Sequence, residues 1–243
     1  MKILPVLGNQ EGVAQYWAEM QKYGAEIDEK NPKYIVVLGG DGTFLGAERE
    51  YYQLGVPFVG VGFGRVNFLL NHFIGTPKEF MENLEKNNWI TFPIYGIDAK
   101  IKTKNGLECG IAFNDVYLKS LDPTRVIRLE LATREYAKLE VAGDGVIIAT
   151  PQGSTAYNRN AGGTILPLDS SLWCLTGICT QKRLRVTVSQ QEVIIKVQSE
   201  NVVLVTDNKI FHDALEVKLS PSFYQGMICF GAQENFEQRR YDA

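Results

Sequence analysis

The sequence predicts an α/β plus all-β protein, with an N-terminal Rossmann-like α/β domain followed by a C-terminal mainly-β, β-sandwich-like domain. Up to about residue 94, short apolar runs alternate with helix-like stretches, which is the pattern of an open α/β sheet. Beyond that point helix signals are scarce, and short runs of alternating polarity are separated by turn signals. The 243 residues are enough for two domains of this kind.

The expected N-terminal α/β domain, residues 1–94, begins with a strand and a helix. Residues 2–8 (KILPVLG) predict the first strand. Residues 11–24 (EGVAQYWAEMQKYG) predict a helix, because apolar residues recur at helical intervals and a glycine ends the stretch. The run KYIVVLGG at 33–40 is continuous and β-rich, which is typical of a strand buried on both faces of a parallel sheet.

The rest of this domain continues the alternation. Residues 43–54 (TFLGAEREYYQL) are helix-like, and residues 56–64 (VPFVGVGFG) predict the next strand. A further helix has a clear start, with Thr76 as the N-cap, Pro77 at the first helical position and Glu79 closing a capping box.

The expected mainly-β domain comprises residues 95–230. Residues 99–113 look like a β-hairpin, with Asn105-Gly106 suited to a type I′ turn. Residues 125–141 alternate in polarity, which predicts a strand with one buried face.

The remaining C-terminal sequence is also dominated by strand signals. Residues 190–220 contain several short β-rich runs with turn signals between them. Residues 170–178 (SSLWCLTGI) are expected to form one or two helical turns. Residues 231–243 are polar and predict a C-terminal tail, with a return to the N-terminal domain as the alternative.

Composition and charge argue against several classes of protein. The formal net charge is −3 and no block of lysine and arginine stands out, so nucleic acid is not an expected partner. The first residues lack a signal-peptide pattern and no apolar run approaches transmembrane length, which predicts a cytoplasmic protein that does not bind membranes. The four cysteines form no CxxC pair and only two histidines occur, which argues against a structural zinc site.

The first motif of functional interest is GGDGTFLG at residues 39–46. Glycines allow the backbone to approach a phosphate, and the helix that follows presents unpaired N–H groups. Thr43 is expected to cap this helix or to donate to a phosphate oxygen. Because a carboxylate repels phosphate, Asp41 is expected to act as a general base toward a hydroxyl or as a magnesium ligand. The alternative is a plain turn, with Asp41 accepting backbone hydrogen bonds.

The second motif, GDGVIIATPQGSTAYNRNAGG, occupies residues 143–163. Its strand-like VIIAT run leads into a short loop that is crowded with hydroxyl and amide side chains and that ends in two glycines. Such a density of hydrogen-bonding groups suits a loop that binds a polar heterocycle and its ribose. The alternative is a glycine-rich bulge that joins two strands.

Together these motifs resemble the NAD kinase family, and AFNDVYLK at 112–119 is similar to that family's Asn-Glu motif. The order of motifs matches along nearly the whole chain, including RVNFLLN at 65–71 and LVTDNK at 204–209. The resemblance implies an enzyme that phosphorylates the 2′-hydroxyl of the adenosine ribose of NAD. It further implies ATP, or sometimes polyphosphate, as phosphoryl donor, Mg²⁺ or another divalent cation, and a homodimer or homotetramer.

The resemblance also implies roles for individual residues. Asp41 resembles the catalytic base, Phe68 an aromatic residue near the adenosine, and Asp144 the family's acid on the nicotinamide side. The residues expected to hold the phosphates of ATP are Gly39, Gly40, Gly42 and Thr43. The residues expected to bind NAD are Gly42, Phe68, Asn114, Asp115, Asp144, Thr155, Ala156, Tyr157, Asn158, Arg159, Asn160, Asp207 and Asn208. The resemblance assigns none of these residues as a metal ligand.

The chain departs from the family pattern at four positions. The family usually has Glu at Asp115, commonly has Ser at Asn160 and Gly at Asn67, and often has Arg or His at Ala142. These changes bear on affinity and substrate preference more than on the reaction. Two other functions stay open, namely a kinase of another hydroxylated small molecule or a lipid, and a nucleotide-binding module without catalysis. The long polar loop disfavours a lipid, and the presence of Asp41 disfavours the module.

Overall fold

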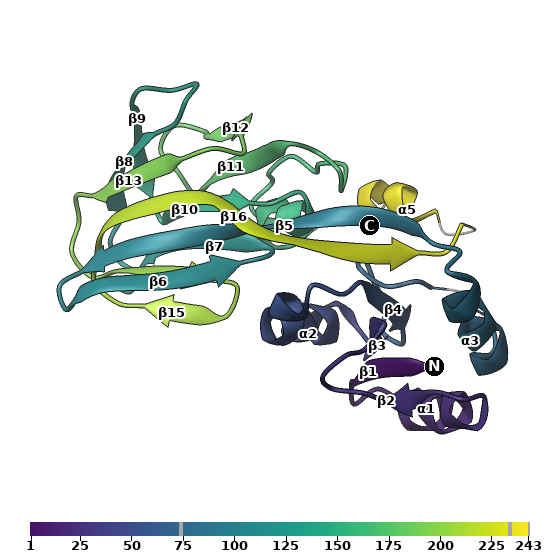
Figure 1. Cartoon of the computed structure of the whole chain (residues 1–243). Helices are drawn as coiled ribbons and strands as arrows, with labels where there is room; N and C mark the ends of the chain where they lie inside the picture. Colours follow the sequence, from purple (N-terminus) through teal and green to yellow (C-terminus); the bar gives the residue numbers. More distant parts are fainter. Residues whose placement is uncertain (73–74, 233–234, 243) are drawn as a thin grey trace. The chain divides into compact units, whose positions relative to one another are not determined.

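The structure, a computed structural model of the chain, describes residues 1–72, 75–232 and 235–242 (Figure 1). The chain divides into two compact units. Unit 1 consists of Met1–Ile94 and Tyr224–Ala243, and unit 2 consists of Tyr95–Phe223. Unit 1 is an α/β unit and unit 2 is almost entirely β, so the predicted fold class is confirmed.

Unit 1 is built around a parallel sheet. Its strands are β1 (Lys2–Leu7), β2 (Glu26–Ile27), β3 (Tyr34–Gly39), β4 (Phe58–Gly62) and the C-terminal part of β16 (Ala214–Phe230). Its helical segments are α1 (Val13–Lys22), α2 (Asp41–Tyr51), η1 (Tyr52–Leu54), α3 (Pro77–Lys86) and α5 (Phe236–Asp242). The strand order is β2-β1-β3-β4, and β16 continues the sheet because Ile228 and Cys229 pair in parallel with β4.

Local signals in the sequence account for these elements. All residues of β3 are buried, as expected for a central strand of a parallel sheet. The Thr76 hydroxyl accepts the Glu79 N–H and the Glu79 carboxylate accepts the Thr76 N–H, so the predicted capping box of α3 is confirmed. In α1, Val13 and Met20 lie in the core of unit 1, which confirms the predicted apolar face.

Unit 2 contains two antiparallel sheets. Its elements are β5 (Ile90–Thr103, which begins in unit 1), β6 (Gly106–Ala112), β7 (Asp115–Ser120), β8 (Ile127–Ala132), β9 (Leu139–Gly143), β10 (Gly145–Ala149), η2 (Gln152–Thr155), α4 (Tyr157–Asn160), β11 (Leu172–Ile178), β12 (Arg185–Ser189), β13 (Val193–Val197), β14 (Val202–Thr206) and β15 (Lys209–Phe211). One sheet has the order β12-β11-β10-β7-β14-β15. In the other, β13 lies between β8 and the first part of β16, and β8 also pairs with β9.

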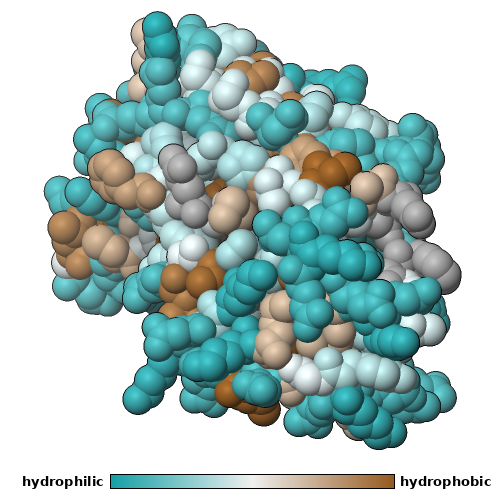
Figure 2. All heavy atoms as spheres, turned by 45° about the vertical axis from the view of Figure 1, so that its right-hand side comes forward, coloured by the Kyte–Doolittle hydropathy of each residue, from teal (hydrophilic) through white to brown (hydrophobic). Residues whose placement is uncertain are grey.

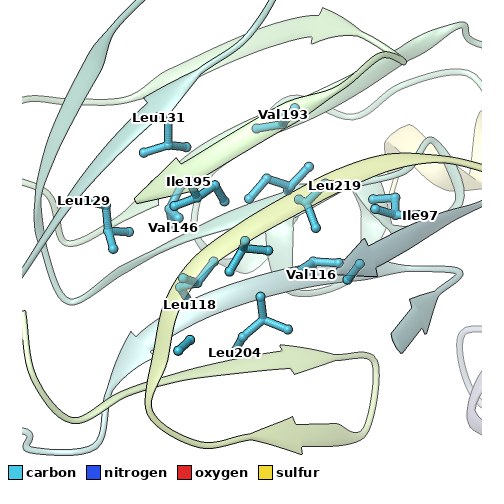
Figure 3. Close-up of a cluster of buried hydrophobic side chains, with 14 of the residues drawn as sticks. Ile97, Val116, Leu118, Leu129, Leu131, Val146, Val193, Ile195, Leu204 and Leu219 are labelled. Atoms are coloured by element: carbon cyan, nitrogen blue, oxygen red, sulfur yellow. The ribbon is translucent and has the colours of Figure 1, made fainter. Parts of the chain in front are cut away.

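The core of unit 2 lies between these two sheets (Figure 3). Val116, Val146 and Leu204 come from the first sheet, and Leu129 and Ile195 come from the second. Since both sheets contribute alternate residues to one core, the unit has the predicted sandwich-like arrangement.

Strand β11 corrects one expectation, because residues 170–178 form no helical turn. This strand pairs with β10 on one side and with β12 on the other, and its central residues Trp173 to Thr176 are buried. A continuous apolar run has no period of its own, so it fits a fully buried strand as well as a short helix.

The hairpin of β5 and β6 is confirmed, but the expected type I′ turn is wrong. Thr103 pairs with Gly106, so the two loop residues are Lys104 and Asn105. A type I′ turn needs a positive φ at both loop residues, whereas in this turn only Gly106 has one (133°). The Thr103 hydroxyl accepts the Asn105 N–H (3.2 Å) and donates to the Gly106 carbonyl (3.1 Å), which stabilises the turn in another way.

The surface offers no large apolar region on the face shown in Figure 2. Hydrophilic side chains cover most of this face, and the hydrophobic ones form small separate groups. Single exposed apolar residues are common on folded proteins. Among the helices of the described residues, none is both long enough and apolar enough to cross a membrane.

Candidate active site

Asp41 is the first residue of α2 and follows the two glycines at the end of β3. Its half-buried carboxylate accepts two backbone hydrogen bonds, from the N–H of Phe68 (2.9 Å) and from the N–H of Leu69 (2.8 Å). Each carboxylate oxygen takes one of these bonds, so the side chain has a fixed orientation. The remaining lone pairs can still accept a proton from a hydroxyl.

Close packing explains the glycine at the end of β3. A Cβ at Gly39 would lie 2.6 Å from the Thr43 hydroxyl oxygen, which is too close for any other residue. Gly40 is the N-cap of α2, and its carbonyl accepts the Thr43 N–H (2.9 Å). Thr43 therefore lies inside the helix, and the expectation that it caps α2 is wrong. No side chain caps this helix, which leaves its first N–H groups for an anionic ligand.

Opposing effects act on the pKa of Asp41. Burial raises the pKa above its ordinary value, because desolvation disfavours the ionised form. The backbone N–H groups of Leu69 and Phe68 lower it, as do the charges of Arg239 and His72. The net result is a raised pKa, which makes Asp41 a stronger base than an exposed aspartate.

Asn67 explains one departure from the NAD kinase pattern. Its φ is +55°, in the left-handed region that glycine favours and asparagine tolerates. Its side chain accepts the Gly64 N–H (3.1 Å) and donates to the Gly64 carbonyl (2.8 Å). Asparagine therefore keeps a backbone conformation that glycine adopts easily, and it closes the loop that leads to Phe68.

In unit 2, Asp207 organises the segment that carries Asn114 and Asp115. Its carboxylate accepts the N–H groups of Phe113 (2.9 Å), Asn114 (3.0 Å) and Asp115 (3.2 Å). Its own N–H donates to the Asp115 carbonyl (3.1 Å) from a left-handed backbone position, φ +49°. These bonds engage the carboxylate with its own chain, and we assign Asp207 to positioning this segment.

Asp115 begins β7 and is only 5% exposed. Burial, followed by the negative charge of Asp207, raises the pKa of its carboxyl from 3.8 to about 7. Tyr117 and Tyr157 are further titratable side chains that interact with it. Near neutral pH the carboxyl is therefore partly protonated, so it can donate as well as accept a hydrogen bond.

The stability of the protein is expected to depend on pH through Asp115. The unfolded carboxyl ionises near its ordinary value of 3.8, and the folded one near 7. Between these values the folded state binds more protons, so the free energy of unfolding falls by about 1.4 kcal/mol per pH unit as pH rises. Asp115→Asn removes this group, and the variant is expected to be more stable than wild type at about pH 8.

Urea unfolding at about pH 5 and about pH 8 measures this effect of Asp115. The control is Asp169→Asn, which changes an exposed aspartate of the same unit. If Asp115→Asn leaves the pH dependence of the urea midpoint unchanged, the assignment of the raised pKa is wrong.

The polar loop after β10 contains the helical segments η2 and α4, in place of a simple turn or bulge. The first residues of this loop are hydrogen-bonded to the AFNDVYLK segment. The Thr150 hydroxyl donates to the Phe113 carbonyl (2.6 Å) and accepts the Gly153 N–H (3.0 Å). The Gln152 amide donates to Asn114 Oδ1 (3.3 Å). The structure therefore brings two separate motifs of the sequence together within unit 2.

Asn158 is fully buried and is bonded on all sides within this unit. Its Nδ2 donates to the carbonyls of Ser154 (3.0 Å) and Thr164 (2.9 Å). Its Oδ1 accepts the hydroxyl of Thr176 on β11 (2.7 Å). Because both N–H groups and the carbonyl are engaged, we assign Asn158 to holding the loop against β11.

Asp144 and Tyr157 line one pocket of about 210 Å³ in unit 2. Tyr157 packs edge-on against Tyr117, with ring centroids 5.1 Å apart. The other polar side chains that line the pocket are Lys119, Ser120, Asp122 and Arg125. Two residues that the resemblance assigns to the nucleotide thus share a cavity. Of its basic side chains, Lys119 ends the AFNDVYLK motif, whereas Arg125 lies outside the motifs.

The remaining candidates differ in exposure. The Thr155 hydroxyl is buried and donates to the Gln152 carbonyl (3.4 Å). The others are exposed or half-buried, namely Gly42, Ala156, Arg159, Asn160 and Asn208.

Sequence reasoning missed several side chains that shape the site. Thr150 and Gln152 lie inside the second motif, and their place within the three residues before Gly153 was the available signal. Arg239, which acts on Asp41, lies in the polar C-terminal stretch and had no signal of any kind.

The chain matches two domain families. Residues 5–88 match the ATP-NAD kinase N-terminal domain, and residues 113–218 match the ATP-NAD kinase C-terminal domain. The NAD kinase of Aquifex aeolicus is 36% identical over 180 residues, which are 72% of this chain and 66% of that protein. The NAD kinase of Natranaerobius thermophilus is 27% identical over 237 residues, 94% of this chain and 83% of that protein.

The NAD kinase of Rickettsia bellii is 33% identical over 163 residues, or 67% of this chain. The aligned part covers 62% of that protein, so the chain spans less than two thirds of this relative's length.

Two solved structures have a similar fold. An NAD kinase from Archaeoglobus fulgidus in complex with ATP has a TM-score of 0.76 and 21% identity, with 99% of both chains covered. Yeast NADH kinase complexed with NADH has a TM-score of 0.82 and 18% identity, with 99% of this chain and 86% of that chain covered. At these identities the likeness establishes the fold alone.

Proposed function

This chain belongs to the ATP-NAD kinase family, and from that premise we propose that it phosphorylates NAD. The proposed reaction moves the γ-phosphoryl group of ATP to the 2′-hydroxyl of the adenosine ribose of NAD, which forms NADP and ADP. The observation that carries the proposal is the oriented carboxylate of Asp41 at the start of α2. The relatives named NAD kinase also support it.

In the proposed mechanism Asp41 accepts the proton of the ribose hydroxyl as the hydroxyl oxygen attacks the γ-phosphorus. An O–P bond forms, the bond from the γ-phosphorus to the bridging oxygen breaks, and ADP leaves with that electron pair. The N–H groups of Phe68 and Leu69 orient the base before the reaction, so no reorganisation is needed. Gly40 and Gly42 let the phosphates approach the N-terminus of α2.

We assign NAD binding chiefly to Asn114 and Asp115 on the adenosine side and to Asp144 and Tyr157 in the pocket described above. The departure at Ala142 lies in a second pocket of unit 2, of about 270 Å³. Arg128 and Lys182 line that pocket together with the acidic Glu140, so it keeps basic side chains although the family's basic residue is absent.

A divalent cation, in the first instance Mg²⁺, is part of the proposal. In the described stretches of the chain, no three His, Cys, Asp or Glu side chains are grouped to hold a metal ion. We propose a cation that enters with ATP, since Mg²⁺ commonly binds through substrate phosphates, waters and one or two carboxylates. When bound, Mg²⁺ neutralises charge on the triphosphate and thereby favours transfer.

We further propose a homodimer or homotetramer in the cytoplasm. All four cysteines are free thiols, which supports a reducing compartment. The oligomeric state rests on the family resemblance, and ATP is proposed as the donor ahead of polyphosphate.

The test is formation of NADP by the purified chain from NAD, ATP and Mg²⁺, followed with an NADP-specific dehydrogenase. Turnover supports the proposal. NAD binding without turnover, seen by calorimetry, favours a non-catalytic nucleotide-binding module. Absence of both turnover and NAD binding favours a kinase of another hydroxylated molecule.

Tyr157→Ala is expected to weaken the apparent affinity for NAD roughly tenfold, because an aromatic wall of the pocket is lost. The effect on kcat is expected to be much smaller. Steady-state kinetics with NAD as the varied substrate measures both. The matched control, Tyr157→Phe, keeps the ring packed on Tyr117 and is expected to retain affinity. An unchanged KM for NAD in Tyr157→Ala argues against its place in the binding pocket.

A further inference from the structure

Aromatic side chains anchor the C-terminal helix α5 in unit 1. Phe236 stacks on Phe230, with ring centroids 4.4 Å apart and an interplanar angle of 9°. Phe236 also packs edge-on against Phe92, with centroids 4.5 Å apart. These contacts fix the helix although the sequence around it is polar, so side chains on α5 have defined positions relative to β5 and the end of β16.

Arg239 reaches from α5 to the loop that holds Asp41. Its Nη1 donates to the carbonyls of Asn67 (3.1 Å) and Leu70 (3.2 Å), and its Nη2 also donates to the Leu70 carbonyl (3.2 Å). The two residues between these carbonyls supply the N–H groups that orient the Asp41 carboxylate. The guanidinium therefore binds the loop on both sides of the two donors.

Other side chains hold the ends of the same loop. The Asn67 side chain closes its start. The buried Asn71 donates to the carbonyls of Gly60 (2.8 Å) and Cys229 (3.1 Å) at its end. Arg239 binds the carbonyls of the part between them. A planar guanidinium can bridge two carbonyls in this way, whereas the ammonium of a lysine is a single flexible point charge.

Arg239 also acts on Asp41 through its charge. Burial is the largest effect on Asp41 and raises its pKa, and the positive charge of Arg239 opposes this. His72, at the end of the same loop, also lowers the pKa of this carboxylate. Removal of the Arg239 charge therefore makes Asp41 hold its proton more tightly.

We propose that Arg239 is a positioning residue for the catalytic base. It holds the loop in the conformation in which two backbone N–H groups orient the Asp41 carboxylate. This inference rests on the proposed function, because it takes Asp41 as the base. It gives the C-terminal helix, which carries none of the sequence motifs, a part in the reaction.

The experiment compares Arg239→Gln and Arg239→Lys with the wild type in the NADP-formation assay. Arg239→Gln is expected to lower kcat roughly tenfold to a hundredfold, because a misplaced base reacts slowly. The KM for NAD is expected to change little. The acid limb of the kcat–pH profile is expected to move to higher pH in Arg239→Gln. Arg239→Lys keeps the positive charge but loses the planar guanidinium that bridges the two carbonyls. In this variant kcat is expected to fall, while the acid limb of the kcat–pH profile is expected to stay at the wild-type pH.

Hydrogen exchange provides a readout that does not need activity. Segment 64–72 is expected to exchange faster in both Arg239 variants than in the wild type, because its central carbonyls lose their donors. The matched control is Gln238→Ala, which changes an exposed residue of the same helix and is expected to behave as the wild type in both assays.

Slower turnover together with faster exchange of this segment supports the inference. Normal kcat and normal exchange in Arg239→Gln, with an active wild type, overturn it. A fall in kcat that merely follows a loss of folded protein in circular dichroism, with no shift of the pH profile, also overturns it. If the wild type forms no NADP, the proposed function fails, and the exchange comparison still decides whether Arg239 holds the loop.

Discussion

Asp41→Asn is expected to lower kcat for NADP formation by roughly 10²- to 10⁴-fold, which is the usual contribution of a general base. An amide cannot take the proton of the attacking hydroxyl at neutral pH. The KM for NAD is expected to change little, because the carboxylate acts on this proton and the nucleotide is held by other residues. Steady-state kinetics with NAD as the varied substrate measures both quantities.

The structure adds a stability cost to this substitution. Each Asp41 oxygen accepts one backbone N–H, from Phe68 and from Leu69. Asparagine has a single oxygen, so its NH₂ group would face one of these donors, and the variant is expected to lose about 1–2 kcal/mol of unfolding free energy. Thermal unfolding and NAD calorimetry therefore accompany the kinetics. A folded variant that binds NAD and still turns over at the wild-type rate rules out Asp41 as the base.

Gly153→Ala is expected to damage unit 2 severely. A Cβ at this position would lie 2.0 Å from the carbonyl oxygen of Asn114 and 2.6 Å from its Cα. These are backbone atoms, so no side-chain rotation can relieve the clash, and the stability loss is expected to be about 3 kcal/mol. Relief of the clash requires the backbone to move, which displaces Asn114. The KM for NAD is therefore expected to rise at least about tenfold.

Urea unfolding and steady-state kinetics check the effect of Gly153→Ala. The control is Gly46→Ala inside α2, where the nearest atom to the added Cβ is at 4.0 Å. That variant is expected to be neutral or more stable by up to about 1 kcal/mol, because alanine favours a helix over glycine. Wild-type stability in Gly153→Ala means that the loop and the Asn114 segment are not packed as described.

The fold could be predicted where local signals were complete within a few residues. The capping box of α3 needs only Thr76 and Glu79, and the buried character of β3 is visible in its own unbroken apolar run. The local sequence of β11 did not decide between a strand and a short helix. Its pairing with β10 and β12, which lie elsewhere in the sequence, decides that the run is a strand.

The motifs located the candidate site better than they identified the task of each side chain. Aspartate and asparagine bind ligands, but they also satisfy backbone groups, and the sequence does not separate these uses. Asp207 and Asn158 prove to be bonded to their own chain. Arg239 lies 172 residues from its partner Asn67, so only the tertiary fold brings the two together.

The chain passes between the two units twice, inside strands β5 and β16. Unit 2 is therefore one continuous stretch of sequence, whereas unit 1 needs segments from both sides of it. During synthesis on the ribosome, the β unit can fold before residues 224–242 have emerged, because domains fold as units as they appear. The α/β unit then receives its last strand and the helix that carries Arg239. The nascent chain thus gains the half to which we assign NAD binding first, and the Arg239 contact that we propose for the base forms last.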